Sequence, residues 1–148
     1  MTHVLVTGAT GYIGGRLVPQ LLAAGYEVSV HVRSAWKPRD VPWREWVHVI
    51  AGDLSDAAAT RRAMTDIDVA FYLVHSMGAG GDFVRAEEEA AQTFADAAAA
   101  AAVGRIVYLG GLHPEEGHLS KHLASRAAVG ELFLYSPVPT IVFQAGIV

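Results

Sequence analysis

Three glycines recur at every third position near the start of the chain, directly after a β-type run at residues 3–6. Gly8 can adopt a backbone conformation that most residues avoid, and Gly11 leaves room for a phosphate to approach the backbone. Gly14 lets the following helix pack close to the strand. The unpaired amides and the positive dipole end at that helix start attract anions. This order of strand, turn and helix predicts a site for the diphosphate of a dinucleotide, with a turn that binds no ligand as the alternative.

A basic residue occupies the position that distinguishes the two nicotinamide dinucleotides. In an NAD site an acidic residue about 20 positions after the glycines binds the ribose hydroxyls. Here Arg33 ends the second predicted strand, and Ser34, Lys37, Arg39 and Arg44 follow it. A guanidinium and a hydroxyl suit a 2′-phosphate, so the sequence favours NADP, with NAD as the alternative. The alternative is a solvated surface loop, which is our interpretation of Arg39 and Arg44.

Asp53 follows the third predicted strand and has two interpretations. It can accept a hydrogen bond from the adenine amino group, or it can be a carboxylate at the start of a helix. Both remain open at this point. The predicted cofactor contacts are Thr7, Gly8, Thr10, Gly11, Tyr12, Ile13, Gly14, Arg33, Ser34, Asp53, Leu54, Ser76 and Gly110.

Proton-transfer chemistry is available at three positions. His75 ends the fourth predicted strand, where it points toward the nicotinamide end of such a site. His122 and Arg126 are one helical turn apart, so a proton donor and an anion-stabilising charge can act together. These three residues are the catalytic candidates, and an amphipathic helix without a catalytic role is the alternative for His122 and Arg126.

A histidine-rich stretch raises the question of a metal. His113, His118 and His122 surround Glu115 and Glu116, and zinc accepts two histidines and a carboxylate. Polar loop residues explain the same pattern, and we predict no metal. The run at residues 87–89, three glutamates, is interpreted as a solvated helix face.

Strand-like and helix-like segments alternate along the whole chain. The predicted strands are residues 4–7, 28–33, 47–51, 69–75, 105–109 and 140–148. The predicted helices are residues 12–24, 56–64, 82–102 and 119–135. Continuous apolar strands that alternate with helices indicate parallel pairing. We expect an α/β fold with a doubly wound parallel (Rossmann) sheet, strand order 3-2-1-4-5-6, in three layers.

Composition limits the classes of function. The 148 residues are 52% hydrophobic, which suits one domain spanning residues 1–148. A net charge of −4 and the absence of a long apolar stretch argue against nucleic-acid and membrane partners, and we expect a cytoplasmic protein. The apolar run at residues 140–148 needs a central place or a cover, so we expect the N-terminal part of a longer protein. A homodimer is a possible assembly.

The chain resembles the short-chain dehydrogenase/reductase superfamily, in its atypical, NmrA-like NAD(P)H-binding branch. The glycine turn, the run Gly52-Asp53-Leu54, and the runs at residues 72–77 and 108–112 carry the resemblance. It implies a dinucleotide cofactor and a small-molecule substrate, whose identity is unknown.

The catalytic residues of that superfamily are missing from this sequence. The resemblance implies a Tyr and, four residues later, a Lys. This sequence has two lysines, and the residues four positions before them are Arg33 and Gly117, not tyrosines. Gly110 and Gly111 stand where the superfamily has a serine. Two classes of function remain: an NADP-dependent oxidoreductase with another proton source, and a sensing or scaffolding protein that binds dinucleotide without turnover. A piece that binds dinucleotide but is inert without its substrate-binding part is a further possibility.

Overall fold

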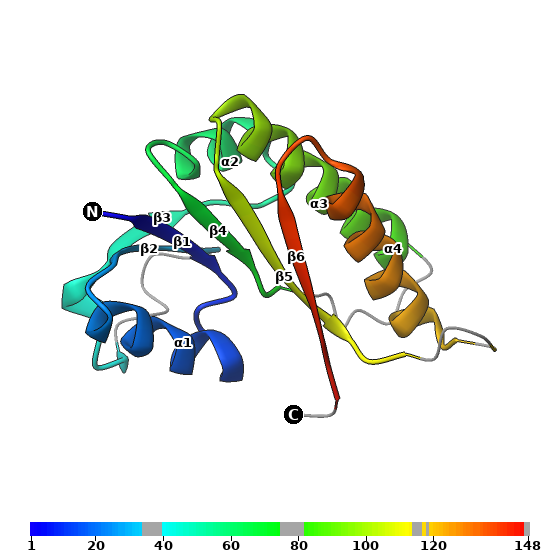
Figure 1. Ribbon diagram of the computed structural model, residues 1–148, viewed down its shortest axis with the longest axis horizontal. Helices are drawn as coiled ribbons and strands as arrows, with labels where there is room; N and C mark the ends of the chain where they lie inside the picture. The colour runs from blue at the N-terminus through cyan, green and yellow to red at the C-terminus, as the bar shows by residue number, and fades with distance from the viewer. Residues whose placement is uncertain (34–39, 75–81, 114–116, 118, 147–148) are drawn as a thin grey trace.

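A six-stranded parallel sheet forms the centre of the computed structural model, which describes residues 1–33, 40–74, 82–113, 117 and 119–146 (Figure 1). The strands are β1 (His3–Thr7), β2 (Glu27–Val32), β3 (His48–Ala51), β4 (Val69–Tyr72), β5 (Arg105–Gly111) and β6 (Thr140–Ala145). Their spatial order is β3-β2-β1-β4-β5-β6, and every neighbouring pair is parallel. The predicted Rossmann sheet and its strand order are therefore confirmed.

Helices cover the sheet on both faces and give the expected three layers (Figure 1). They are α1 (Tyr12–Ala23), α2 (Ala57–Ala63), α3 (Phe83–Ala100) and α4 (Lys121–Tyr135). Side chains alternate along a strand, so the two faces of β1 enter different cores. Val4 and Val6 pack with Val18 of α1, whereas Leu5 packs with Phe94 of α3.

The ends of β4 and β5 differ from the sequence prediction by two or three residues. β4 ends at Tyr72 instead of residue 75, because its partner β1 ends at the paired residue Thr7. β5 continues to Gly111 instead of residue 109, because Gly110 and Gly111 pair with β6. The two glycines therefore lie within a strand and not in the loop after it.

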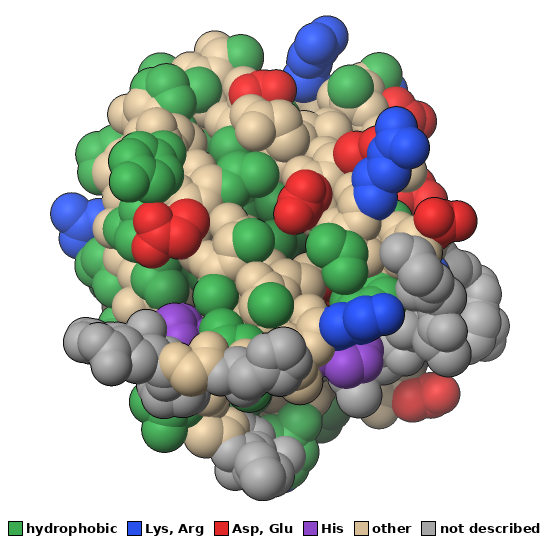
Figure 2. All heavy atoms as spheres, turned by 90° about the vertical axis from the view of Figure 1, so that its right-hand side faces the viewer, with side chains coloured by type: hydrophobic (Ala, Val, Ile, Leu, Met, Phe, Trp, Pro, Cys, Tyr) green, Lys and Arg blue, Asp and Glu red, His purple; other side chains and the backbone are tan. Residues whose placement is uncertain are grey.

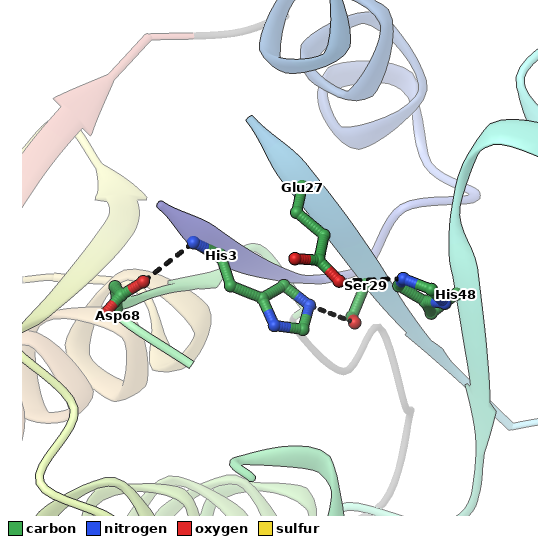
Figure 3. Close-up of polar contacts among 5 residues, drawn as sticks. All are labelled: His3, Glu27, Ser29, His48 and Asp68. Atoms are coloured by element: carbon green, nitrogen blue, oxygen red, sulfur yellow. Dashed lines mark hydrogen bonds and ion pairs between the residues drawn. The ribbon is translucent and has the colours of Figure 1, made fainter. Parts of the chain in front are cut away.

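Polar contacts of side chains connect neighbouring strands at their amino ends (Figure 3). His3 Nε2 lies 2.7 Å from Ser29 Oγ, and the His3 amide donates to Asp68 Oδ2 at 2.8 Å. His48 Nε2 lies 3.0 Å from Glu27 Oε1. These contacts lie at the opposite ends of the strands from the glycine turn, and all three are formed between side chains or backbone groups of this chain.

The last strand, β6, lies at an edge of the sheet. Ile141 is 38% exposed and Phe143 is 56% exposed.

Hydrophobic, acidic and basic side chains are mixed on the face that corresponds to the right-hand side of Figure 1 (Figure 2). Among the described residues, no helix is long and apolar enough to span a membrane.

The contact between α1 and the turn after β1 gives a prediction about Gly14. A Cβ at Gly14 would lie 2.7 Å from Ala9 Cα and closer still to the Gly8 carbonyl, whereas a Cβ at Gly15 would make an ordinary 3.6 Å contact with the Ala9 carbonyl. We expect Gly14→Ala to lower the free energy of unfolding by about 1–3 kcal/mol, because the crowded backbone must move. The control Gly15→Ala should keep or raise it by up to about 1 kcal/mol. Urea unfolding measures both, and equal stabilities would contradict the close-packing role.

Candidate functional site

A cavity of about 720 Å³ opens at the carboxyl ends of the strands, on the side that α3 covers. Ligands bind at this edge in open parallel sheets. The cavity is lined by Gly8, Thr10, His31, Val32, Arg33, Gly52, Asp53, Leu54, Ser55, Tyr72, Val74, Ala86, Glu87, Ala90, Tyr108 and Val129. Five predicted cofactor contacts are among them: Gly8, Thr10, Arg33, Asp53 and Leu54. Residues far apart in the sequence thus meet around one cavity.

The glycine turn leaves the start of α1 open. Gly8 has φ +74°, and a Cβ there would lie 3.0 Å from the Leu73 backbone carbonyl, so both conformation and space require glycine. Gly11 is the N-cap of α1, and no side chain caps that helix. By contrast, Asp56 and Ser120 cap α2 and α4 with side-chain hydrogen bonds. The first amides of α1 therefore stay available to an anion.

The other predicted turn residues lie outside this cavity. Thr7 is fully buried, and its hydroxyl donates to the Phe71 carbonyl at 2.9 Å. Tyr12 is 61% exposed, and the Arg16 guanidinium lies 3.6 Å from its ring centroid. Ile13 is half-buried and Gly14 is buried against the turn, so neither belongs to the lining. The predicted residues Ser34, Ser76 and His75 lie outside the described residues.

Arg33 and Asp53 place opposite charges at one end of the cavity. Arg33 is exposed at the end of β2. Asp53 Oδ1 accepts hydrogen bonds from the amide and the hydroxyl of Ser55, both at 2.9 Å. These two bonds, with a smaller contribution from the Arg33 charge, lower the pKa of Asp53. Asp53 therefore shapes the turn that leads to α2 and also lines the cavity, whereas the carboxylate that caps the start of α2 is Asp56.

A second cavity, of about 330 Å³, lies between β5, β6 and α4. Gly110 and Arg126, two of the predicted site residues, both line it. Arg126 Nη2 donates to the Leu109 carbonyl at 3.4 Å, and its buried Nε has no hydrogen-bond partner among the described residues. A Cβ at Gly111 would lie 3.2 Å from Arg126 Nη1. Gly111 therefore makes room for the guanidinium beside the strand.

His122 does not join Arg126 at this cavity. Its exposed ring stacks on Phe83, with centroids 4.8 Å apart, and it belongs to the lining of neither cavity. His113 lines the second cavity, with its Nε2 lying 3.3 Å from Gln144 Nε2. In the part of the chain that is described, no group of three or more potential metal ligands is arranged around one point.

Two buried tyrosines line the larger cavity and were not among the predicted site residues. Tyr72 is 4% exposed and Tyr108 is 2% exposed. Burial is the main cause that raises the pKa of each phenol, and the Arg126 charge only partly opposes it at Tyr108. The Tyr108 hydroxyl donates to the Arg126 carbonyl at 3.1 Å. Both phenols therefore stay protonated at neutral pH, unlike a phenol whose pKa a neighbouring cation lowers.

The interpretation of Glu87 as part of a solvated face is wrong. Glu87 is half-buried, and its Oε2 accepts a 2.8 Å hydrogen bond from the buried Ser125 hydroxyl of α4. The period of α3 places Glu87 in line with the buried residues Ala91 and Phe94, on the side that packs on α4. The sequence contains this helical spacing, but a run of three acidic residues is more typical of a solvated face, so the burial of Glu87 was not predicted.

The family assignment follows from comparison with known proteins. A family model described as NAD(P)H-binding matches residues 8–131, which include the glycine turn and most of α4. The chain belongs to this NAD(P)H-binding family. Dinucleotide binding, predicted from the turn, is a property of this family.

Relatives of this family extend well beyond the matched part. The ceramide reductase of Caulobacter vibrioides is 33% identical over 128 residues, which cover 84% of this chain and 39% of the relative. The structure of Citrobacter sp. triphenylmethane reductase complexed with NADP(H) has a TM-score of 0.81 at 22% identity, and the match covers 98% of this chain and 50% of that one. A superfamily protein from Agrobacterium tumefaciens with bound NAD has a TM-score of 0.77 at 20% identity, covering 96% and 48%. The chain thus spans half or less of these relatives, and the fold accommodates either dinucleotide.

The bond between Glu87 and Ser125 gives a stability prediction. We expect Ser125→Ala to lower the free energy of unfolding by about 1–3 kcal/mol, because a half-buried carboxylate loses a donor. The control is Glu89→Ala, which removes the exposed Arg85–Glu89 pair on α3, the helix that carries Glu87. It should lower the free energy of unfolding by less than about 0.5 kcal/mol. Urea unfolding at pH 7 measures both. Equal losses would show that the contact between α3 and α4 contributes no more than an exposed pair.

Proposed function

We propose that this chain is the dinucleotide-binding, N-terminal part of an NADP-preferring reductase that acts on a small molecule. Arg33 carries the proposal, since it lines the cavity at the position where an NAD site has a carboxylate. Its exposed guanidinium suits a 2′-phosphate that stays partly hydrated. The amides at the open start of α1 suit the diphosphate.

The second cavity is the proposed position of the substrate oxygen. A bound reduced dinucleotide supplies the hydride in this chemistry. Arg126 then stabilises the negative charge that develops on the substrate oxygen, because its buried Nε has a donor left unused among the described residues. Tyr108 lies between the two cavities, but its raised pKa makes it a poor proton source. The proton then comes from solvent or from the candidate histidine His75, since His122 lines neither cavity.

A sensing protein without turnover is the second candidate. The absence of any Tyr-x-x-x-Lys pair supports it, as does the stacking of His122 on Phe83 away from both cavities. The two candidates share the dinucleotide site and differ only in what happens at Arg126.

Cofactor preference is tested at Arg33. We expect Arg33→Asp to weaken NADPH binding by about 1.5–3 kcal/mol, the scale of one charged hydrogen bond, and to change NADH binding little. Arg44→Asp is the matched control, since it changes the net charge equally at a residue that lines neither cavity. Isothermal titration of both cofactors gives the dissociation constants. An equal loss for NADPH and NADH would show that Arg33 does not bind the 2′-phosphate.

Turnover is tested by NADPH oxidation with a panel of quinones, aldehydes and enones. With an active substrate, we expect Arg126→Gln to lower kcat by about 10²–10³-fold, since one donor to an oxyanion is lost. The dissociation constant for NADPH should stay within about twofold, because Arg126 lies at the second cavity. Lys121→Gln on the same helix is the control and should leave kcat unchanged. Tight NADPH binding by the full-length protein without oxidation of any panel member would favour the sensing protein.

A further inference from the structure

A buried histidine on β2 faces the larger cavity with an unsatisfied nitrogen. His31 is 5% exposed, and its Nε2 has no hydrogen-bond partner among the described residues. Buried side-chain nitrogens without a partner are rare in folded proteins and call for an explanation. Because His31 lines the cavity, a ligand in the cavity can satisfy this nitrogen.

That nitrogen is buried beside the turn that follows β3. Gly52 of the neighbouring turn has no side chain, and a Cβ there would lie 3.6 Å from His31 Nε2. The burial of the ring lowers its pKa, while the Asp53 charge acts in the opposite direction more weakly. His31 is therefore a neutral imidazole at pH 7, which can donate or accept a single hydrogen bond at Nε2.

At the amino ends of the strands, another histidine has its side-chain hydrogen bond formed. His3 on β1 has a partner for its Nε2, which lies 2.7 Å from the Ser29 hydroxyl of β2 (Figure 3). Ser29 and His31 lie on the same face of β2, two residues apart. The chain thus completes the hydrogen bonding at the amino end of this strand and leaves it open at the cavity end.

The position of His31 favours one part of the dinucleotide. Arg33 lies two residues after His31, directly past the end of β2 at the exposed rim, where a charged 2′-phosphate can keep water. His31 lies deeper, in a cavity that Leu54 and Val74 also line. A neutral, buried imidazole suits a flat, largely apolar base with polar atoms on its edge and does not compensate a buried dianion.

We propose that His31 Nε2 forms a hydrogen bond with the edge of the adenine base and thereby contributes affinity for NADPH and NADH alike. This inference rests on the proposed function, in which the larger cavity holds the dinucleotide. In this proposal His31 binds the adenine base, and Arg33 binds the 2′-phosphate.

The test compares His31→Phe with the control His3→Phe. Phenylalanine keeps the ring and removes the nitrogens, so H31F should leave the melting temperature of the ligand-free protein unchanged or higher, since a buried unsatisfied group is lost. H3F should lower it, because the bond to Ser29 is lost. H31F should raise the dissociation constants of NADPH, NADH and 5′-AMP by the same factor, about tenfold, and leave that of reduced nicotinamide mononucleotide unchanged. H3F should change none of them.

A measurement on the wild-type protein covers the case in which H31F does not fold. The ¹⁵N resonance of His31 Nε2 should shift on saturation with 5′-AMP and stay in place with reduced nicotinamide mononucleotide. His31→Gln, which keeps a polar group at similar reach, should recover part of the lost affinity.

Three results would overturn the inference. Unchanged cofactor affinities in H31F, with a lower melting temperature, would make His31 a structural residue. A loss confined to NADPH would assign His31 to the 2′-phosphate instead of the base. If the wild-type protein bound neither dinucleotide, the proposed function would fail together with this inference, whereas wild-type binding that H31F leaves intact would overturn the inference alone.

Discussion

The close approach of α1 to the turn after β1 is the contact on which the site depends. Gly8 adopts φ +74° against the backbone of Leu73, and Gly14 lies so near Ala9 that even a methyl group would overlap it. These two contacts fix where α1 begins and direct its first amides to the carboxyl edge of the sheet. β1 itself is paired with β2 and β4, where the order of the strands reverses and ligands bind in open parallel sheets.

Hydrogen bonding is distributed unequally between the two ends of the sheet. At the amino ends, His3, Ser29 and Asp68 satisfy one another (Figure 3). At the carboxyl ends, the buried nitrogens left without partners among the described residues are His31 Nε2 at the larger cavity and Arg126 Nε at the second. Unsatisfied groups cost stability, and proteins retain them where a ligand completes the bonding. Each cavity therefore contains one group suited to a different part of a bound complex.

Sequence patterns were sufficient for the architecture because they involve local chemistry. The alternation of apolar strands and helices predicts the strand order, and the spacing of Gly8, Gly11 and Gly14 predicts the open start of α1. The end of β5 was not predictable in this way, because glycines usually interrupt strands and here Gly110 and Gly111 pair with β6. Tertiary pairing decided that boundary.

The site residues that sequence reasoning missed are those whose surroundings come from distant segments. His31 lies in an apolar strand, and only its position two residues before Arg33 indicated that both face the same side. Glu87 follows the buried period of α3, but the adjacent acidic residues resembled a solvated face. The burial of Tyr72 and Tyr108 depends on packing against Phe133 of α4, which no local pattern shows.

The electrostatics of the cavities limit the chemistry that this fold can support. A phenol acts as a proton donor near neutral pH when a cation lowers its pKa, but burial raises the pKa of both cavity tyrosines. The Arg126 guanidinium faces the second cavity, while the Tyr108 hydroxyl is already bonded to the Arg126 backbone. In the proposed function, charge stabilisation by Arg126 is therefore separate from proton donation, whereas the resemblance to the superfamily implies a Tyr and a Lys one helical turn apart. A reductase built on this site would rely on Arg126 to stabilise an anionic oxygen and would take the proton from elsewhere.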